Sequence, residues 1–396
     1  MSLWSRRRVL AASLLLNGPS LKGAQGSRFE QEAVELTDEL TGRALDRLTD
    51  LKILFHFPHY HHHFLASNNR SLILGGEADG TRQIHYYDLR RNRITQLTGG
   101  EGTFPYSATM DDAEKEVFYL QSDGLNRTSL NGRGHRQVFR LPGGWRFTGH
   151  MSISEGARTA ALVEIREDDY RDNPTEQIAV SPQCRIRVVD LASGRDRIAV
   201  TQRAWLTYPQ FRPGRRELLY TQEAGAGLGA QVYWSNIDEK NAKPLRPDDG
   251  SRIDRAYWAL GGGEARFVHF PDESLRGATI RSIVPETGAE RRIARCSAFG
   301  WLQENVDGSA YVGASKRPSG PNIYVLFPSL DREITLCEHG ATRKPYPIAG
   351  TDRLDYFCAV PETVFSRDSQ WVYYSSDREG QPAVYRMKVE DLVEST

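Results

Sequence analysis

The sequence predicts an all-β fold, a seven-bladed β-propeller, on two observations. Polar turns alternate with short aromatic and β-branched runs along the chain after residue 50, as in Phe365–Tyr374 followed by Ala383–Met387. This unit recurs with a spacing of roughly 45 to 60 residues, which is the length of a four-stranded propeller blade. Seven copies fit the 396 residues, and no linker or change of composition near the middle favours a pair of β-sandwiches instead.

The composition is that of an ordinary globular protein, with 39% hydrophobic, 10% aromatic and 26% charged residues. Lysine plus arginine and aspartate plus glutamate both number 51, so no net field indicates binding to nucleic acid or to a membrane surface. No apolar run is long enough to span a bilayer.

Residues 1–26 predict a signal peptide of the twin-arginine type. Arg6, Arg7 and Arg8 precede the short apolar run Ala11–Leu16, and small residues follow around Ala24. We therefore expect export to the periplasm, with a disordered basic tail as the alternative. Export would leave the four cysteines in an oxidising compartment. Their wide spacing predicts neither a zinc site nor a disulfide pairing.

Residues 27–50 are expected to form a lead-in helix or linker, because Glu30–Asp50 has a helical pattern, and the propeller is expected over residues 51–396. Residues 51–56 form a candidate strand that closes the ring. The predicted strands of the successive blades are 68–74, 84–89 and 94–97; 116–119, 125–130 and 137–139; 159–163 and 185–191; 217–220 and 231–234; 266–269 and 279–283; 310–312 and 322–326; 371–374 and 383–387. Insertions at 167–182 and 336–356 are candidates for one functional face, because propellers bind ligands where loops meet at one mouth of the channel.

Several stretches resemble the oligogalacturonate lyases, seven-bladed propellers that cleave short pectin fragments by β-elimination. Leu74–Gly80 resembles the first blade of that family, Pro182–Leu191 its Pro-Arg-Cys-Arg segment, and Trp205–Gly214 its Trp-Leu-Gly-His-Pro segment. Phe365–Tyr385 resembles the last blade. The resemblance implies a carbon–oxygen lyase that acts on short acidic (galacturonide) oligosaccharides in pectin breakdown.

The sequence departs from the family at the metal site. The resemblance implies a divalent metal such as manganese, bound by a His after a Cys-Ser pair and by a Gln and two His in a Gln-x-x-His-Pro-His stretch. Here Ala298 follows the Cys-Ser pair, and Phe357–Glu362 reads Phe-Cys-Ala-Val-Pro-Glu. Of these positions only Glu362 has a metal-binding atom, so the sequence does not decide whether the protein binds a divalent metal.

The family's catalytic positions are changed as well. The position of its general base, a His shortly before an aromatic-Trp pair, holds Arg255. A family arginine position holds Gln231, and the His of Gly-His-Pro is replaced by Tyr208. His56 falls where the family has a histidine just upstream of the first blade.

β-Elimination on a uronide removes the proton at C5 and develops charge on the neighbouring carboxylate, which a cation must stabilise. The planar guanidinium of Arg255 can hold that carboxylate, but its pKa is too high for a base. Histidine titrates in the required range. His56, His59 and His61 are therefore candidate bases, with Tyr208 as a candidate acid.

The run Pro58–Phe64 contains four histidines. If it is a strand, His59, His61 and His63 share one face at a period of two and are candidate metal ligands together with Glu362. The alternative is a solvated or hydrogen-bonded histidine run in the ring-closing strand.

Candidate substrate-binding residues are Gln231, Arg185, Trp205 and Trp258, the tryptophans by stacking on a sugar ring. Packing between blades is the alternative for the arginine and the tryptophans. Two functions stay open at this point. One is a lyase in which Arg255 and the histidine region replace the family's metal and base. The other is a non-catalytic propeller, similar to TolB and WD40-like repeats, that binds sugars or a protein partner in the periplasm.

Overall fold

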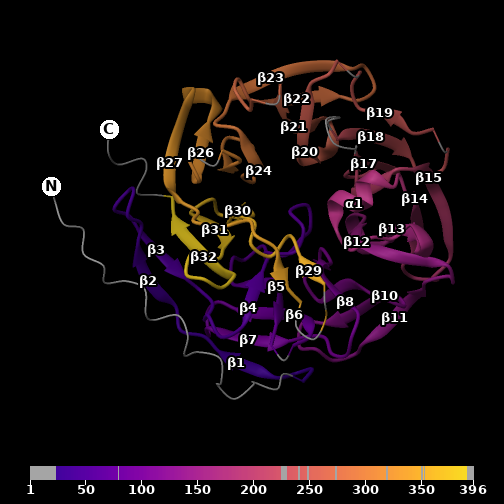
Figure 1. Ribbon diagram of the computed structural model, residues 1–396, viewed down its shortest axis with the longest axis horizontal. Helices are drawn as coiled ribbons and strands as arrows, with labels where there is room; N and C mark the ends of the chain where they lie inside the picture. The colour runs from indigo at the N-terminus through magenta and orange to yellow at the C-terminus, as the bar shows by residue number, and fades with distance from the viewer. Residues whose placement is uncertain are drawn as a thin grey trace.

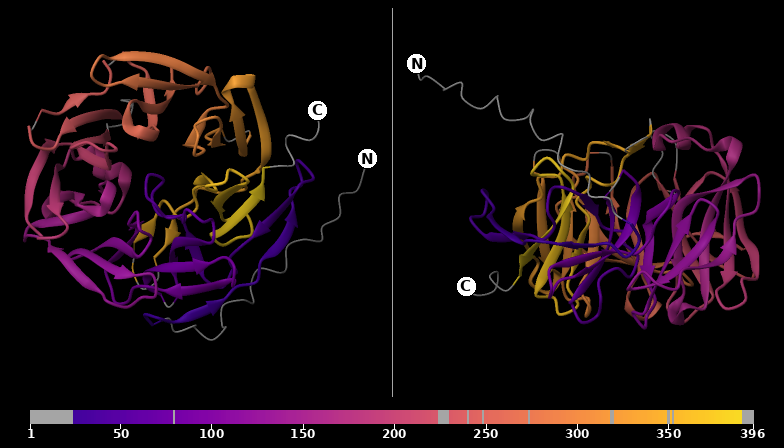
Figure 2. Two further views of the ribbon diagram at one scale, coloured as in Figure 1. Left: turned by 180° about the vertical axis from the view of Figure 1, so that it is seen from behind. Right: turned by 90° about the horizontal axis from the view of Figure 1, so that it is seen from below.

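The computed structural model describes residues 24–389, except 79, 224–229, 240, 248, 273, 318–319, 349–350 and 352. Seven antiparallel sheets stand around a central channel as the blades of a propeller (Figure 1). Seen from the side, the strands run roughly along the axis of the ring (Figure 2). The prediction of a seven-bladed, all-β propeller is confirmed.

The strands of the first four blades are β4 (Leu54–His56), β5 (Ser71–Glu77), β6 (Arg82–Asp88) and β7 (Arg93–Gln96); β8 (Thr103–Met110), β9 (Glu116–Gln121), β10 (Gly124–Ser129) and β11 (Arg136–Arg140); β12 (Trp145–Ile153), β13 (Thr159–Arg166), β14 (Gln183–Asp190) and β15 (Asp196–Arg203); β16 (Trp205–Phe211), β17 (Glu217–Glu223), β18 (Gln231–Asn236) and β19 (Lys243–Pro244).

The strands of the other blades are β20 (Arg252–Trp258), β21 (Ala265–Phe270), β22 (Thr279–Val284) and β23 (Ala289–Arg295); β24 (Phe299–Glu304), β25 (Tyr311–Ser315), β26 (Asn322–Phe327) and β27 (Arg332–Glu338); β30 (Thr363–Phe365), β31 (Trp371–Ser376) and β32 (Ala383–Lys388). A small hairpin consists of β28 (Tyr346–Pro347) and β29 (Leu354–Asp355). The short helices are η1 (Glu155–Ala157), η2 (Glu167–Asp169), α1 (Pro174–Ala179), η3 (Leu260–Gly262) and η4 (Pro328–Leu330).

Residues 27–50 contain strands, so the predicted lead-in helix is wrong. β2 (Val34–Thr37) and β3 (Ala44–Arg47) form a hairpin, and β3 pairs with β32, the last strand of blade 7. β1 (Arg28–Glu30) adds an outer strand to blade 1. The helical spacing is overridden because β32 offers unpaired backbone groups at its edge and because Leu36 and Leu45 pack against blade 7. β3 therefore closes the ring, whereas the predicted closing segment 51–56 supplies β4, the inner strand of blade 1.

The core lies between neighbouring blades. Tyr119, Tyr220, Tyr311 and Tyr373 each occupy the second strand of a blade, and all four are almost completely buried. Burial of each such aromatic side chain stabilises the fold by roughly 1.5–3 kcal/mol. The aromatic runs that revealed the repeat are thus the residues that hold the blades together.

The predicted signal peptide lies outside the described residues apart from residues 24–26. Within the described part of the chain, no helix combines the length and apolar character needed to cross a membrane. All four cysteines are free thiols, three of them buried.

Irregular inner strands in neighbouring blades place side chains at the channel. Gly149 in β12, Tyr208 in β16 and Arg255 in β20 have φ angles of 89°, 48° and 53°. Each lies at a break in the register with the next strand. Ala298, just before β24, has a φ of 55°. Such bulges re-aim one side chain, and through them Tyr208 and Arg255 reach the same cavity.

Candidate functional site

Both predicted insertions lie at the same mouth of the channel. Arg353 Nε lies 2.7 Å from Asp172 Oδ1, and Arg353 Nη2 donates a hydrogen bond to Tyr170 Oη at 3.0 Å. These contacts join the loop at 336–356 to the insertion at 167–182. Together with β8, β12 and His59 the two segments line a cavity of about 570 Å³. They form one face, as the sequence predicts.

A second cavity, of about 260 Å³, surrounds Arg255. Arg255 Nη1 lies 2.9 Å from Glu362 Oε1, and Nε donates to the carbonyl oxygen of Gly300 at 2.8 Å. The Arg255 and Glu362 side chains are only 12% and 13% exposed. The guanidinium carbon lies 4.6 Å from the ring centre of Tyr60 and 5.7 Å from that of Trp301. Arg255 lines this cavity, so its guanidinium can meet a ligand there.

Arg255 is a permanent cation. Burial alone would lower the pKa of Arg255, but Glu362, Tyr208 and Asp254 raise it above its ordinary value. Burial raises the pKa of the Glu362 carboxyl, and Arg255 opposes that rise. The Arg255 guanidinium therefore keeps its proton, which excludes Arg255 as the base.

The rest of this cavity has polar walls. Lys316 forms an ion pair with Asp254, and Glu223 accepts a hydrogen bond from Thr207 Oγ1 at 2.8 Å. Burial raises the pKa of Glu223. Gly300 leaves room for the Lys316 side chain, because a Cβ at residue 300 would lie 2.7 Å from Lys316 Cε. Lys316 is thus a second cation in the Arg255 cavity, and sequence reasoning did not find it.

The histidine run contains a turn inside the channel and is not a strand (Figure 1). The backbone N–H of His62 donates to the carbonyl oxygen of His59 at 2.9 Å. The His59 ring stacks on His150 of β12 with 4.4 Å between ring centres. Tyr208 stands edge-on to both rings, at 5.2 and 4.7 Å. The His61 ring stacks near the His59 ring with 6.1 Å between ring centres, and its Nε2 is 3.0 Å from the carbonyl oxygen of Met151.

These imidazoles are uncharged at neutral pH. Burial lowers the pKa of His59 well below its ordinary value, and the neighbouring imidazoles lower it further. Burial also brings the pKa of His150 to about 3 and that of His62 to about 4. A neutral imidazole has one ring nitrogen free to accept a proton, so His59 retains the predicted character of a base.

The predicted metal set of His59, His61, His63 and Glu362 is not assembled. His63 Nε2 lies 3.4 Å from Glu114 Oε1, and Glu362 is paired with Arg255. In the described ranges no three His, Cys, Asp or Glu side chains are placed to hold a metal ion. The period-two argument fails because alternate residues share a face only in a strand.

Three other predicted residues line neither cavity. His56 lies beneath Tyr106, with 4.1 Å between the stacked rings, and burial lowers the pKa of His56 to about 4. Gln231 accepts a hydrogen bond from Tyr233 Oη at 3.0 Å. Arg185 lies 3.5 Å above the ring centre of Trp145 and pairs with a buried glutamate. In all three, the observed contacts are structural.

The two predicted tryptophans lie at different places. Trp205 lines the 570 Å³ cavity, where it can contact a sugar ring. Trp258 lines a separate cavity of about 360 Å³ together with His61, His62 and His63. Its Nε1 donates to the carbonyl oxygen of Gln210 at 3.3 Å. Of the two, only Trp205 belongs to the mouth with the insertions.

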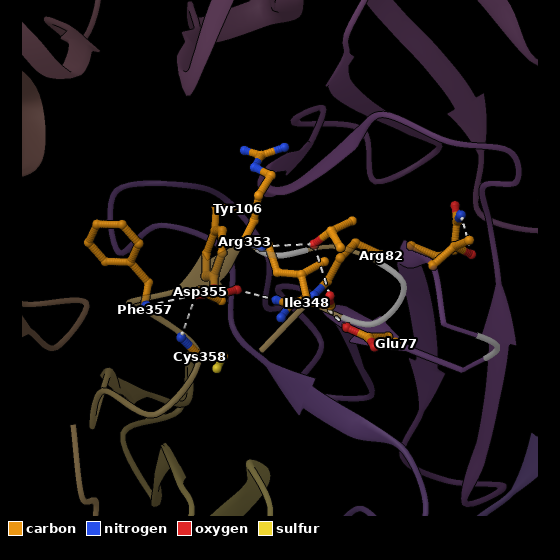
Figure 3. A network of polar contacts seen from close by, with 11 residues as sticks. Glu77, Arg82, Tyr106, Ile348, Arg353, Asp355, Phe357 and Cys358 are labelled. Atoms are coloured by element: carbon orange, nitrogen blue, oxygen red, sulfur yellow. Dashed lines mark hydrogen bonds and ion pairs between the residues drawn. The ribbon is translucent and has the colours of Figure 1, made fainter. Parts of the chain in front are cut away.

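Asp355 ties the mouth loop to blades 1 and 2 (Figure 3). Its carboxylate accepts hydrogen bonds from Tyr106 Oη at 2.9 Å and from the backbone N–H groups of Phe357 and Cys358 at 2.7 and 3.1 Å, and it pairs with Arg82. Burial alone would raise the pKa of Asp355, but Arg82 and these hydrogen bonds lower it. Sequence reasoning missed this network because its members are far apart in the chain and share no motif.

The fold and the mouth define a seven-bladed β-propeller with a cavity at one end of its channel. The family model for oligogalacturonate lyase matches residues 24–393, so the chain belongs to that family. It is 23% identical over 395 residues to the oligogalacturonate lyase of Dickeya dadantii (strain 3937), an alignment that covers 93% of this chain and 99% of the relative.

Two solved structures are similar in fold over nearly their whole length. An oligogalacturonate lyase in complex with manganese has a TM-score of 0.85 and 23% identity, with 92% of this chain and 98% of that chain covered. An oligogalacturonate lyase from Vibrio parahaemolyticus has a TM-score of 0.83 and 22% identity, with 92% and 99% covered.

The residues at the family's metal positions do not fit a metal. Ala298, Phe357 and Val360 have no side-chain ligand atom, and the Glu362 carboxylate is paired with Arg255. A divalent ion needs several oxygen, nitrogen or sulfur ligands that converge on it. We therefore assign the positive charge of this site to Arg255 and route no step of a reaction through a metal.

Proposed function

We propose that this protein binds short galacturonide oligosaccharides at the mouth with the insertions and cleaves them by β-elimination. The observation that carries the proposal is the position of Arg255. It stands where the resemblance places the general base of the family, and it lines a cavity with polar walls. A guanidinium binds a carboxylate through two parallel N–H···O bonds. Membership of the family supports the choice of a uronide as the ligand.

In the proposed reaction Arg255 binds the carboxylate next to C5 and stabilises the charge that develops on it. His59 accepts the C5 proton, the C4–O4 bond breaks and a C4=C5 double bond forms. Tyr208 donates its phenolic proton to the leaving oxygen. Burial raises the pKa of Tyr208, which keeps the hydroxyl protonated until that step. The bound anion raises the depressed pKa of His59 towards the working pH, where a base is most effective.

The two cavities support an oligosaccharide of few units. Their volumes are about 570 and 260 Å³, and small-molecule sites usually measure roughly 300–1,000 Å³. We place the reacting residue beside Tyr208, which lines the Arg255 cavity and contacts the ring of His59 in the larger cavity. The larger cavity, with Trp205 in its wall, takes the neighbouring residues. We also propose that the protein acts in the periplasm, which the pattern of residues 1–26 supports.

The test is formation of the unsaturated product. Purified protein is incubated with oligogalacturonides of defined length, and the near-ultraviolet absorbance of the new double bond is followed, with the Dickeya dadantii enzyme as positive control. We expect product from the wild type. His59→Gln should remove the product and leave oligosaccharide binding, measured by calorimetry, in place, whereas Arg255→Gln should remove both.

The same assay separates the two functions. Binding by the wild type without product would support a non-catalytic propeller that binds oligosaccharides. Absence of binding, with the positive control active, would refute the proposal.

A further inference from the structure

Two residues at positions that the resemblance assigns to the family's site form an ion pair in this chain. Arg255 stands at the position of the base and Glu362 at the position of a metal ligand, and they meet at 2.9 Å. Arg255 belongs to the inner strand of blade 5, and Glu362 lies directly before the inner strand of blade 7. Because these blades are distant in the chain, the pair is a feature of the assembled channel and not of local sequence.

The surroundings of the pair suit a guanidinium. Tyr60 faces Arg255 at 4.6 Å and is itself fixed, since its hydroxyl donates to the carbonyl oxygen of Ala256 at 3.0 Å and accepts from Gln210 Nε2 at 3.2 Å. The carbonyl oxygen of Gly300 accepts from Arg255 Nε at 2.8 Å. Aromatic faces attract an organic cation. They supply none of the oxygen or nitrogen ligands that a divalent ion requires.

A divalent ion is also disfavoured by charge. The one remaining ligand position, Glu362, already neutralises Arg255, and the metal would have to share or displace that cation. Displacement would leave the guanidinium without its ion-pair partner at a site that is 12% exposed. Sharing would place two cations on one carboxylate.

We propose that this family member carries the cation of its site within its own chain: Arg255, held by Glu362, replaces the divalent metal, and a uronate carboxylate is its ligand. The statement about the ligand rests on the proposed function, whereas the statement about the metal does not.

The first test is direct metal binding. The full chain is treated with chelator, dialysed against Mn²⁺ and assayed by elemental mass spectrometry and titration calorimetry. The solved relative that binds manganese, treated in the same way, is the positive control. We expect stoichiometric uptake by the relative, none by this chain, and the same Tm for this chain in Mn²⁺ and in chelator. Stoichiometric uptake by this chain, or a Tm that rises with Mn²⁺, would overturn the inference.

The second test is the affinity for trigalacturonate, measured by calorimetry. It should be the same in Mn²⁺ and in chelator. Arg255→Lys keeps the charge but loses the two parallel N–H donors, so the affinity should fall by at least about tenfold. Arg266→Lys is the matched control, because Arg266 pairs with Glu304 and lines neither cavity; its affinity should be that of the wild type.

These measurements distinguish a failure of the inference about the metal from a failure of the proposed function. An affinity that requires Mn²⁺, or that Arg255→Lys leaves unchanged, would overturn the inference even if the protein makes product. Absence of product would count against the proposed function and would leave the metal measurement standing.

Discussion

Glu362→Gln isolates the charge of the ion pair, because the amide keeps the shape of the side chain. The change leaves Arg255 without its counter-charge at a site where the two side chains are 12% and 13% exposed. Unit charges about 4 Å apart attract by about 4 kcal/mol at an effective dielectric constant of about 20. Breaking a buried pair costs about 3–5 kcal/mol, and the amide oxygen retains part of the interaction, so we expect a loss of about 2–4 kcal/mol in the free energy of unfolding.

The assay is urea unfolding of wild type and variant, read together with the affinity for trigalacturonate. Stability should fall while affinity rises, because Arg255 loses the carboxylate that competes with the ligand. Glu304→Gln is the matched control: the Arg266–Glu304 pair has side chains that are 16% and 11% exposed. We expect it to lose similar stability and to leave the affinity unchanged.

The reasoning would be refuted by a stability loss under about 1 kcal/mol, the value of an exposed pair. It would also be refuted by a double-mutant cycle with Arg255→Met in which the two losses add to within about 0.5 kcal/mol. We expect the double variant to lose clearly less than the sum, because neither charge is then left alone.

Three further outcomes follow from the structure. Gly300→Ala should weaken trigalacturonate binding several-fold in calorimetry with little change in Tm, because the new Cβ displaces the Lys316 side chain. Gly263→Ala is the control: no atom lies within 4 Å of its new Cβ, so neither the affinity nor the Tm should change. His150 has a pKa of about 3 in the folded protein against about 6.5 in the unfolded chain. The stability that the uncharged imidazole contributes is therefore complete above about pH 6.5 and is lost as the pH falls towards 3. The urea concentration at the midpoint of unfolding should decrease as the pH falls, and less steeply in His150→Phe. Asp355→Asn should release the mouth loop, seen as faster amide exchange at residues 341–358, and an unchanged exchange rate there would contradict the role of the carboxylate network (Figure 3).

The blade repeat was predictable because the same residues signal the strands and fill the core. Tyr373 and Tyr119 mark the second strands of their blades in the sequence and are buried in the structure. Ring closure was not predictable in this way. Leu36 and Leu45 fit a helical spacing as well as a strand, and only the free edge of β32, a partner at the other end of the chain, decides between them.

The candidate site was predictable only where it follows the family. The matched positions found Arg255, Tyr208 and Glu362, two of which are in one cavity and the third in contact with Arg255. Periodicity misplaced the histidines, because the run turns at residues 60–62, so that His59 lines one cavity and the other three histidines line another. No motif or spacing in the sequence indicated a role for Lys316 or Asp355. The role of Lys316 depends on Gly300, and that of Asp355 on Tyr106, and neither partner is a neighbour in the sequence.

The architecture explains how the site can change while the fold does not. Tyr208 and Arg255 lie at bulges of inner strands, where they line a cavity and belong to none of the apolar clusters between the blades. The buried aromatic strands hold the blades together, and the fold matches that of a manganese-binding relative with a TM-score of 0.85 at 23% identity. The charges of Arg255 and Glu362, however, cannot be removed one at a time without a loss of stability. Arg255 without Glu362 is a buried charge without a partner, and Glu362 without Arg255 is the same with the opposite sign. The guanidinium and the carboxylate are therefore one unit, and in our proposal this unit supplies the charge of a metal that Ala298, Phe357 and Val360 have no side-chain atoms to bind.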